Sequence, residues 1–274
     1  MGLIKFAYRL YKKINTPPRV DIISYPKSGR TWLSFMIGSY FITKYGLDHR
    51  QHNIVHELLS VSRKAKGVAP IHIHHDGPVH NMTPSSLEKG KERYEKSKVI
   101  FLVRDPRDVV VSMYFEKSKR IPARKDETNE KPFTGTIKQF LYHEEGSIET
   151  IIEFMNIWYL NRNVPKDFML VKYEELRKAT AKHLEKILKF VGESNVDRHA
   201  LREAIDRGSF ESMRSIESKG SMEGFGLRPA NKDDFDSYKT RRGKVGGYID
   251  YFDDEDIKYL ERVIQSRLNT AFGY

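Results

Sequence analysis

Short apolar runs alternate along the chain with longer segments whose apolar residues recur at helical spacing. The runs are unbroken and rich in β-branched residues, which is typical of strands that are buried on both faces. The predicted strands cover residues 20–24, 70–75, 99–104 and 168–173, and the second has the weakest pattern. The predicted helices cover residues 31–44, 85–96, 106–119, 148–162, 180–191 and 253–271.

This alternation predicts an α/β fold, a single domain with a central parallel β-sheet flanked by helices. The chain of 274 residues suits one domain that spans residues 1–274, and neither an internal repeat nor a linker interrupts it. Two polar stretches, 117–135 and 218–247, break the pattern. Long loops inside a compact domain are usually functional, so we expect residues 218–247 to form a lid loop.

The composition narrows the choice of partner and mechanism. A net charge of +11 and a pI near 9.5 favour an anionic partner, such as a phosphorylated ligand, a nucleic acid, an acidic glycan or a membrane surface. The chain has no cysteine, which excludes disulfides, thiol nucleophiles and Cys-ligated metals and favours a reducing compartment. No run reaches the roughly 18 apolar residues of a membrane span, so we expect a soluble, cytoplasmic protein.

The N-terminal residues 1–16 form an amphipathic pattern with one apolar and one basic face. This pattern predicts a helix, for which two interpretations stay open. The helix packs on its own domain and leaves the basic face in water, or it makes peripheral contact with an anionic membrane.

The turn after the first predicted strand has the chemistry of a phosphate site. Ligands of parallel α/β proteins gather where strands end and helices begin, because a helix N-terminus offers unpaired N–H groups. Gly29 permits a tight turn, Ser28 and Thr31 supply hydroxyls, and Lys27 supplies a positive charge. The turn therefore predicts phosphate binding.

The turn does not match the nucleotide-triphosphate pattern G-x-x-x-x-G-K-[ST]. Ser24 stands where that pattern has its first glycine, and Arg30 stands where it has lysine. An ATP-dependent small-molecule kinase with a related P-loop would also need an acidic magnesium ligand, and Asp105 is better placed to cap a helix that begins at Pro106. The kinase stays as an alternative function.

The segment "YPKSGRTW" resembles the 5′-phosphosulfate loop of sulfotransferases that use 3′-phosphoadenosine-5′-phosphosulfate (PAPS). Three later segments resemble further motifs of that family in the same order: "LVRDPRDVVVSMYF" (102–115), "GSFESM" (208–213) and "TRRGKVGG" (240–247). The resemblance spans nearly the whole chain. It implies a PAPS-dependent sulfotransferase with a P-loop NTPase-like fold, which releases adenosine 3′,5′-bisphosphate (PAP) and needs no metal.

The resemblance also implies roles for individual residues, grouped here by the part of PAPS that they would contact. The 5′ end would bind to Lys27, Ser28, Gly29, Arg30 and Thr31; the adenine to Trp32, Tyr173 and Phe210; and the 3′-phosphate to Arg104, Ser112, Arg241, Arg242 and Gly243. Arg104 ends a predicted strand, and Ser112 stands about 9 Å along the following helix at ~1.5 Å per residue, so both could reach one phosphate. The alternative is an ion pair of Arg104 with Asp105 or Asp108.

Transfer of a sulfuryl group to a hydroxyl or amine needs a base for the acceptor's proton, and histidine suits that task near neutral pH. The resemblance places the base in "PIHIHHDG", where we select His75, with His74 as second choice. Lys27 would stabilise the leaving group. Many relatives have a lysine two residues before the base, but this chain has Ile73 or His72 there. A metal site formed by the three histidines is disfavoured because no Cys or carboxylate set completes it.

The acceptor and the quaternary state are open at this level. The polar, basic loops that would form the acceptor pocket favour a carbohydrate, a glycolipid or another small alcohol. A non-catalytic nucleic-acid binder is a further alternative, but the basic residues are scattered and no nucleic-acid motif is present, so we expect no nucleic-acid partner. The dimer motif of many relatives is not evident after Gly247, which leaves the oligomeric state undetermined.

Overall fold

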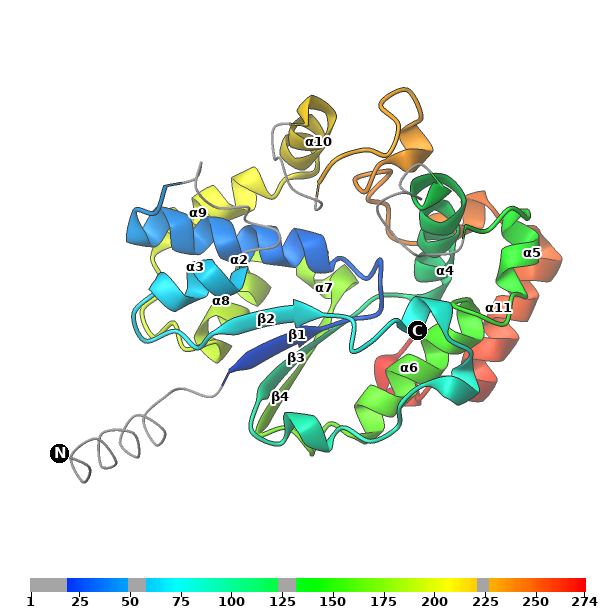
Figure 1. Cartoon of the computed structure of the whole chain (residues 1–274), viewed down its shortest axis with the longest axis horizontal. Coiled ribbons are helices and arrows are strands. Elements are labelled where there is room, and N and C mark those ends of the chain that lie inside the picture. The colour runs from blue at the N-terminus through cyan, green and yellow to red at the C-terminus, as the bar shows by residue number, and fades with distance from the viewer. Residues whose placement is uncertain (1–18, 49–57, 123–131, 221–226) are drawn as a thin grey trace.

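The computed structural model describes residues 19–48, 58–122, 132–220 and 227–274. Its centre is a four-stranded sheet with the strand order β2-β1-β3-β4, and all neighbouring strands are parallel (Figure 1). The strands are β1 (Val20–Ile23), β2 (Ile71–His74), β3 (Lys98–Val103) and β4 (Asp167–Lys172). The four predicted strands and the α/β fold are therefore confirmed.

Helices cover both faces of the sheet, and each face has its own hydrophobic core. Val20 and Ile22 point to one core and Ile23 points to the other, as the two-residue period of a strand requires. The first core includes residues of α2 (Arg30–Tyr45), α3 (Leu58–Lys64), α8 (Thr180–Phe190) and α9 (Arg198–Arg207). The second includes residues of α4 (Pro106–Phe115), α6 (Ile148–Leu160) and α11 (Asp254–Arg267).

Three further helices complete the set of α-helices among the described residues: α5 (Ile137–Leu141), α7 (Tyr173–Lys178) and α10 (Phe210–Lys219). The sequence pattern did not predict these three helices, nor α3 and α9. The N-terminal helix predicted over residues 1–16 lies outside the described residues. Within them, no helix is both long and apolar enough to cross a membrane.

The helix predicted over residues 85–96 is wrong. The chain forms two isolated 3-10 turns there, Pro84–Ser86 and Glu92–Tyr94. Leu87, Lys91 and Tyr94 are buried at a spacing that imitates a helix, but Gly90 weakens helix formation between the two turns. The Lys91 ammonium group makes a buried ion pair at 3.0 Å with Asp76, which holds this segment against the loop after β2.

The two predicted loops are only partly irregular. Residues Glu116–Arg120 continue α4 as one π-helical turn, and α10 extends to Lys219. Residues 227–246 have a single 3-10 turn, Phe235–Ser237, and a second one begins at Gly247. The start of α4 is as predicted, because the Asp105 side chain accepts a hydrogen bond from the N–H of Arg107 and Pro106 occupies the first turn.

The turn between β1 and α2 depends on a glycine. Gly29 has a φ of +98°, in the left-handed region that favours glycine. A Cβ atom on Gly29 would lie 2.5 Å from Cδ2 of Tyr173, the first residue of α7. The loop between β1 and α2 is thus packed directly against the ring of Tyr173, which follows β4.

We predict that Gly29→Ala destabilises the protein by more than the roughly 1–3 kcal/mol expected for left-handed strain alone, because the added methyl group overlaps the Tyr173 ring. Gly67→Ala is the matched control, since Gly67 has a φ of +82° and nothing within 4 Å of its Cβ position. Urea unfolding of both variants measures the difference. Equal losses of stability would show that the contact with Tyr173 contributes nothing.

Candidate functional site

A cavity of about 520 Å³ lies at the edge of the sheet where the parallel strands end. In the strand register, Ile23 pairs with both His74 and Phe101, and Val103 pairs with Lys172. The residues that follow β1, β2, β3 and β4 are therefore neighbours in space. They are the loop 24–29, His75, Arg104 and Tyr173, and the last three line the cavity.

All but one of the predicted site residues line this single cavity. They are Lys27, Gly29, Arg30, Thr31, Trp32, His75, Arg104, Ser112, Tyr173, Phe210, Arg241, Arg242 and Gly243. The exception is Ser28, which is buried and does not line the cavity. Segments from six parts of the sequence thus meet at one place.

The ammonium group of Lys27 is held by a carboxylate that the sequence analysis did not select. Lys27 Nζ lies 2.6 Å from Oε2 of Glu116, in the π-helical turn after α4, and both side chains are mostly buried. The same oxygen lies 3.1 Å from Nε of Arg120. Burial alone would raise the pKa of Glu116, but the charges of Lys27 and Arg120 lower it below its ordinary value. Glu116 is therefore ionised.

The charge network continues from Arg120 to the segment that contains the predicted lid residues. Arg120 lies 3.6 Å from the fully buried carboxylate of Glu217 in α10. Glu217 accepts hydrogen bonds from the backbone N–H groups of Lys239 and Thr240, at 2.7 and 2.9 Å. Buried charged groups connect the loop after β1 to residues 239–240.

The histidines at the end of β2 point in different directions. Nδ1 of His75 lies 2.9 Å from the carbonyl oxygen of Ser24, and this oxygen can only accept, so Nδ1 carries the ring proton. His74 lies outside the cavity, with Nε2 at 3.1 Å from Asp21 and Nδ1 accepting from the N–H of Asp76. The alternation of faces along the strand end separates the two rings. Of this pair, only His75 faces the cavity.

Arg30, the first residue of α2, contacts the second nitrogen of His75. Its Nη2 lies 2.6 Å from Nε2 of His75, and its Nη1 is buried without a hydrogen-bond partner among the described residues. Burial and, to a lesser extent, the nearby Arg30 charge lower the pKa of His75 well below 6.5. Burial also lowers the pKa of Arg30 to about 10, so this residue keeps its charge at neutral pH.

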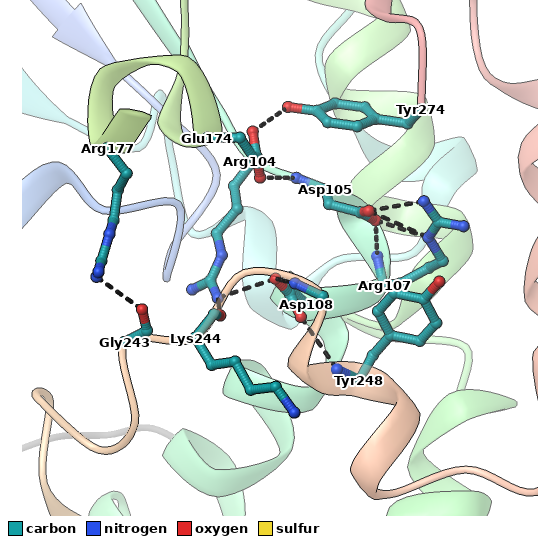
Figure 2. A network of polar contacts seen from close by, with 11 residues as sticks. Arg104, Asp105, Arg107, Asp108, Glu174, Arg177, Gly243, Lys244, Tyr248 and Tyr274 are labelled. Atoms are coloured by element: carbon teal, nitrogen blue, oxygen red, sulfur yellow. Dashed lines mark hydrogen bonds and ion pairs between the residues drawn. The ribbon is translucent and has the colours of Figure 1, made fainter. Parts of the chain in front are cut away.

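Arg104 also lines the cavity and lies in a second polar network (Figure 2). It forms an ion pair at 3.2 Å with Asp108, the sequence-based alternative to phosphate binding, and it donates a hydrogen bond to the carbonyl of Lys244. Asp108 also accepts from the N–H groups of Gly246 and Tyr248. The ion pair leaves Nε of Arg104 buried without a partner among the described residues.

The predicted lid residues follow the same wall of the cavity. The carbonyl of Gly243 accepts a hydrogen bond from Arg177 (Figure 2). Gly243 has a φ of +59°, and its Cβ position lies 2.8 Å from the Phe210 ring. The guanidinium group of Arg241 stacks on Phe115 at 4.0 Å. The half-exposed Arg242 pairs with Asp250 at 3.1 Å.

Aromatic residues form the remaining wall. Trp32 contacts Tyr173 edge to face, and its indole N–H donates to the carbonyl of Gly208 at 2.7 Å. A Cβ atom on Gly208 would lie 2.6 Å from Cγ of Met36. A larger residue at this position would therefore require Met36 to move.

Sequence reasoning named Asp108 as a partner of Arg104 but missed Glu116, the partner of Lys27, and Glu217, which continues the network through Arg120. Glu116 lies one helical turn after Ser112, so the spacing along the helix could have placed both on one face. No such signal exists for Glu217, because its partners come from segments far apart in the chain. The motifs indicated the candidate cations, whereas the pairing of Lys27 with Glu116 depends on the tertiary fold.

Comparisons with known proteins agree with this arrangement. Flavonol 3-sulfotransferase of Flaveria bidentis is 24% identical over 275 residues, covering 93% of this chain and 83% of that protein. The 3-beta-hydroxysteroid sulfotransferase of Cavia porcellus is 26% identical over 261 residues, covering 90% and 82%. Among solved structures, mouse sulfotransferase SULT7A1 complexed with PAP has a TM-score of 0.59 at 20% identity and covers 92% of this chain and 84% of that one.

A second solved structure, retinol dehydratase in complex with androsterone and inactive cofactor PAP, has a TM-score of 0.58 at 17% identity, with coverage of 92% and 80%. These likenesses show the same fold. The sulfotransferase domain family matches residues 17–272, which include every residue placed around the cavity. This chain belongs to the sulfotransferase family.

Proposed function

We propose that the protein transfers a sulfuryl group from PAPS to a hydroxyl or amine of a small acceptor. The observation that carries the proposal is the convergence on one cavity of the loop 27–31, the strand-end residues His75 and Arg104, and the segment 241–243. When bound, PAPS supplies the sulfuryl group that is displaced in line onto the acceptor. The residues of this chain position the reactants and stabilise negative charge.

The cavity has unsatisfied donors that suit an anionic nucleotide. Nη1 of Arg30 and Nε of Arg104 are buried and have no hydrogen-bond partner among the described residues. Buried donors are normally paired, so each of these groups favours an anion nearby. Arg30 belongs to the segment 27–31 that would hold the 5′ end, and Arg104 lines the same cavity as Ser112, where the 3′-phosphate would bind.

Lys27 would stabilise negative charge on the oxygen of the leaving group. Its ammonium group is kept in place by Glu116, which also keeps it from being a lone buried charge. His75 would accept the acceptor's proton at Nε2, since Nδ1 is committed to the carbonyl of Ser24. In this proposal Lys27 acts on the leaving group and His75 acts on the acceptor.

The acceptor is proposed to be a small alcohol, such as a carbohydrate or glycolipid hydroxyl. The curated relatives are named for flavonol and steroid acceptors, which are also hydroxyl compounds. The residues that line the cavity include His80, Glu116 and Lys239 as well as the apolar Met113, and this mixture suits a hydroxylated molecule with an apolar part.

Nucleotide binding separates this function from the kinase alternative. We expect PAP at about 100 times its Kd to stabilise the protein by about 2.7 kcal/mol, whereas ATP with magnesium gives a much smaller effect. Thermal unfolding with each nucleotide measures this. Stabilisation by ATP with magnesium and none by PAP would overturn the donor assignment. Arg104→Ala should lose most of the PAP effect.

Two substitutions test the catalytic roles. His75→Ala should lower the rate of transfer by about 10²–10⁴-fold through loss of the base, and Lys27→Ala by about 10²–10³-fold or more through loss of charge stabilisation. Sulfate transfer from labelled PAPS to a panel of alcohols provides the assay. His199→Ala and Lys66→Ala change the same residue types on the exposed surface and should keep full activity. Full activity in both site variants would refute the roles.

A further substitution tests how Lys27 is held. Glu116→Gln should lower the stability of the fold by roughly 1–3 kcal/mol. It should lower kcat and change the KM for the donor less, because the ammonium group of Lys27 loses the carboxylate that fixes its position. Glu203→Gln, on the exposed side of α9, is the matched control. An unchanged kcat with only a lower melting temperature would limit Glu116 to a structural role.

A further inference from the structure

Arg30 blocks the nitrogen that the proposed reaction needs. The ring proton of His75 is on Nδ1, where it is donated to Ser24, so the lone pair is on Nε2. That lone pair accepts a hydrogen bond from Nη2 of Arg30 at 2.6 Å. In this arrangement His75 cannot take a proton from an acceptor hydroxyl, because its only basic position is occupied.

Arg30 is also poorly satisfied where it lies. Its Nη1 is buried with no hydrogen-bond partner among the described residues, and no ion pair joins Arg30 to a carboxylate among them. A neutral imidazole is a weak partner for a buried guanidinium group compared with a phosphate or sulfate, which accepts two parallel hydrogen bonds. An anion that reaches the loop 27–31 would therefore compete successfully with His75 for Arg30.

Resting on the proposed function, we propose that Arg30 is a positioning residue that covers Nε2 of His75 until the 5′ end of the donor binds. The 5′-phosphate draws the guanidinium group away from the ring, and Nε2 then becomes available to the acceptor. In the transfer step the acceptor's proton passes to Nε2 of His75, while Arg30 keeps its own protons. Donor binding thereby uncovers the base before the acceptor reacts.

The charges around His75 make this change measurable. The groups that face the ring are Arg30 from α2, the carbonyl of Ser24 after β1, His80 from the 3-10 turn Val79–Asn81, and Lys239 from the segment after α10. Burial and the cations lower the pKa of His75, whereas the carbonyl raises it. Moving Arg30 onto a phosphate removes one cation and adds an anion, and both changes raise the pKa of His75.

The titration of His75, followed by NMR of ring-labelled histidine, tests the proposal. The signal is assigned by its loss in His75→Gln. PAP should raise the pKa of His75 by about one unit, a tenfold change in protonation. Adenosine 3′-monophosphate has no 5′-phosphate and should leave the pKa unchanged at saturation. If PAP binds without moving the pKa, or if both nucleotides move it equally, the proposal is overturned.

Variants of Arg30 provide a second readout. In Arg30→Gln the pKa of His75 should be higher before any nucleotide is added, and PAP should shift it less than in the wild type. Arg30→Lys keeps the charge and should restore part of the shift. Arg63→Gln, an exposed arginine of α3, should behave as the wild type. If PAP shifts the pKa of His75 in Arg30→Gln as much as in the wild type, the proposal is contradicted. If a variant does not fold, the comparison of the two nucleotides in the wild type decides the question.

Calorimetry of PAP binding distinguishes the two levels of the argument. If PAP does not bind to the wild type, the proposed function fails and this inference fails with it. If PAP binds and the titration of His75 does not respond, the sulfotransferase assignment stands and only the role of Arg30 is lost.

Discussion

The parallel register of the four strands is the constraint on which the site depends. Because all four strands run in one direction, the residues that follow them reach the same edge of the sheet. His75, Arg104 and Tyr173 are each the first residue after a strand and come from widely separated parts of the sequence. A shift of one residue in any strand would turn its terminal side chain to the opposite face. The chemistry of the cavity is therefore set by backbone pairing.

The cavity concentrates cations that would repel one another without counterions. The protein meets this problem with buried carboxylates, among them Glu116 beside Lys27 and Asp108 beside Arg104. Arg30 is different, because its guanidinium group contacts the neutral ring of His75 and no carboxylate among the described residues pairs with it. At the turn between β1 and α2, the charge of Lys27 is therefore neutralised by Glu116, whereas the charge of Arg30 is not neutralised by a carboxylate among the described residues. This arrangement suits a site for an anionic ligand.

Much of the fold was predictable from the sequence, because strands buried on both faces leave unbroken β-branched runs. The prediction of a helix at residues 85–96 was wrong for two reasons. The ion pair with Asp76 fixes the position of the buried Lys91, and Gly90 weakens helix formation beside it. For the site, motifs indicated the cations and the histidines. To choose between His74 and His75, one must know where β2 ends and which of the two rings lines the cavity. The pairing of Lys27 with Glu116 joins residues that are 89 positions apart, so it is visible only in the folded structure.

The backbone of the segment after α10 is fastened at two points. Glu217 holds the N–H groups of residues 239 and 240, and Asp108 holds those of residues 246 and 248. Only five residues, 241–245, lie between these fasteners. Their number is consequently fixed by the span between α10 and α4. Natural variants of this protein should therefore keep the length of this stretch constant and accept changes of length upstream of residue 239.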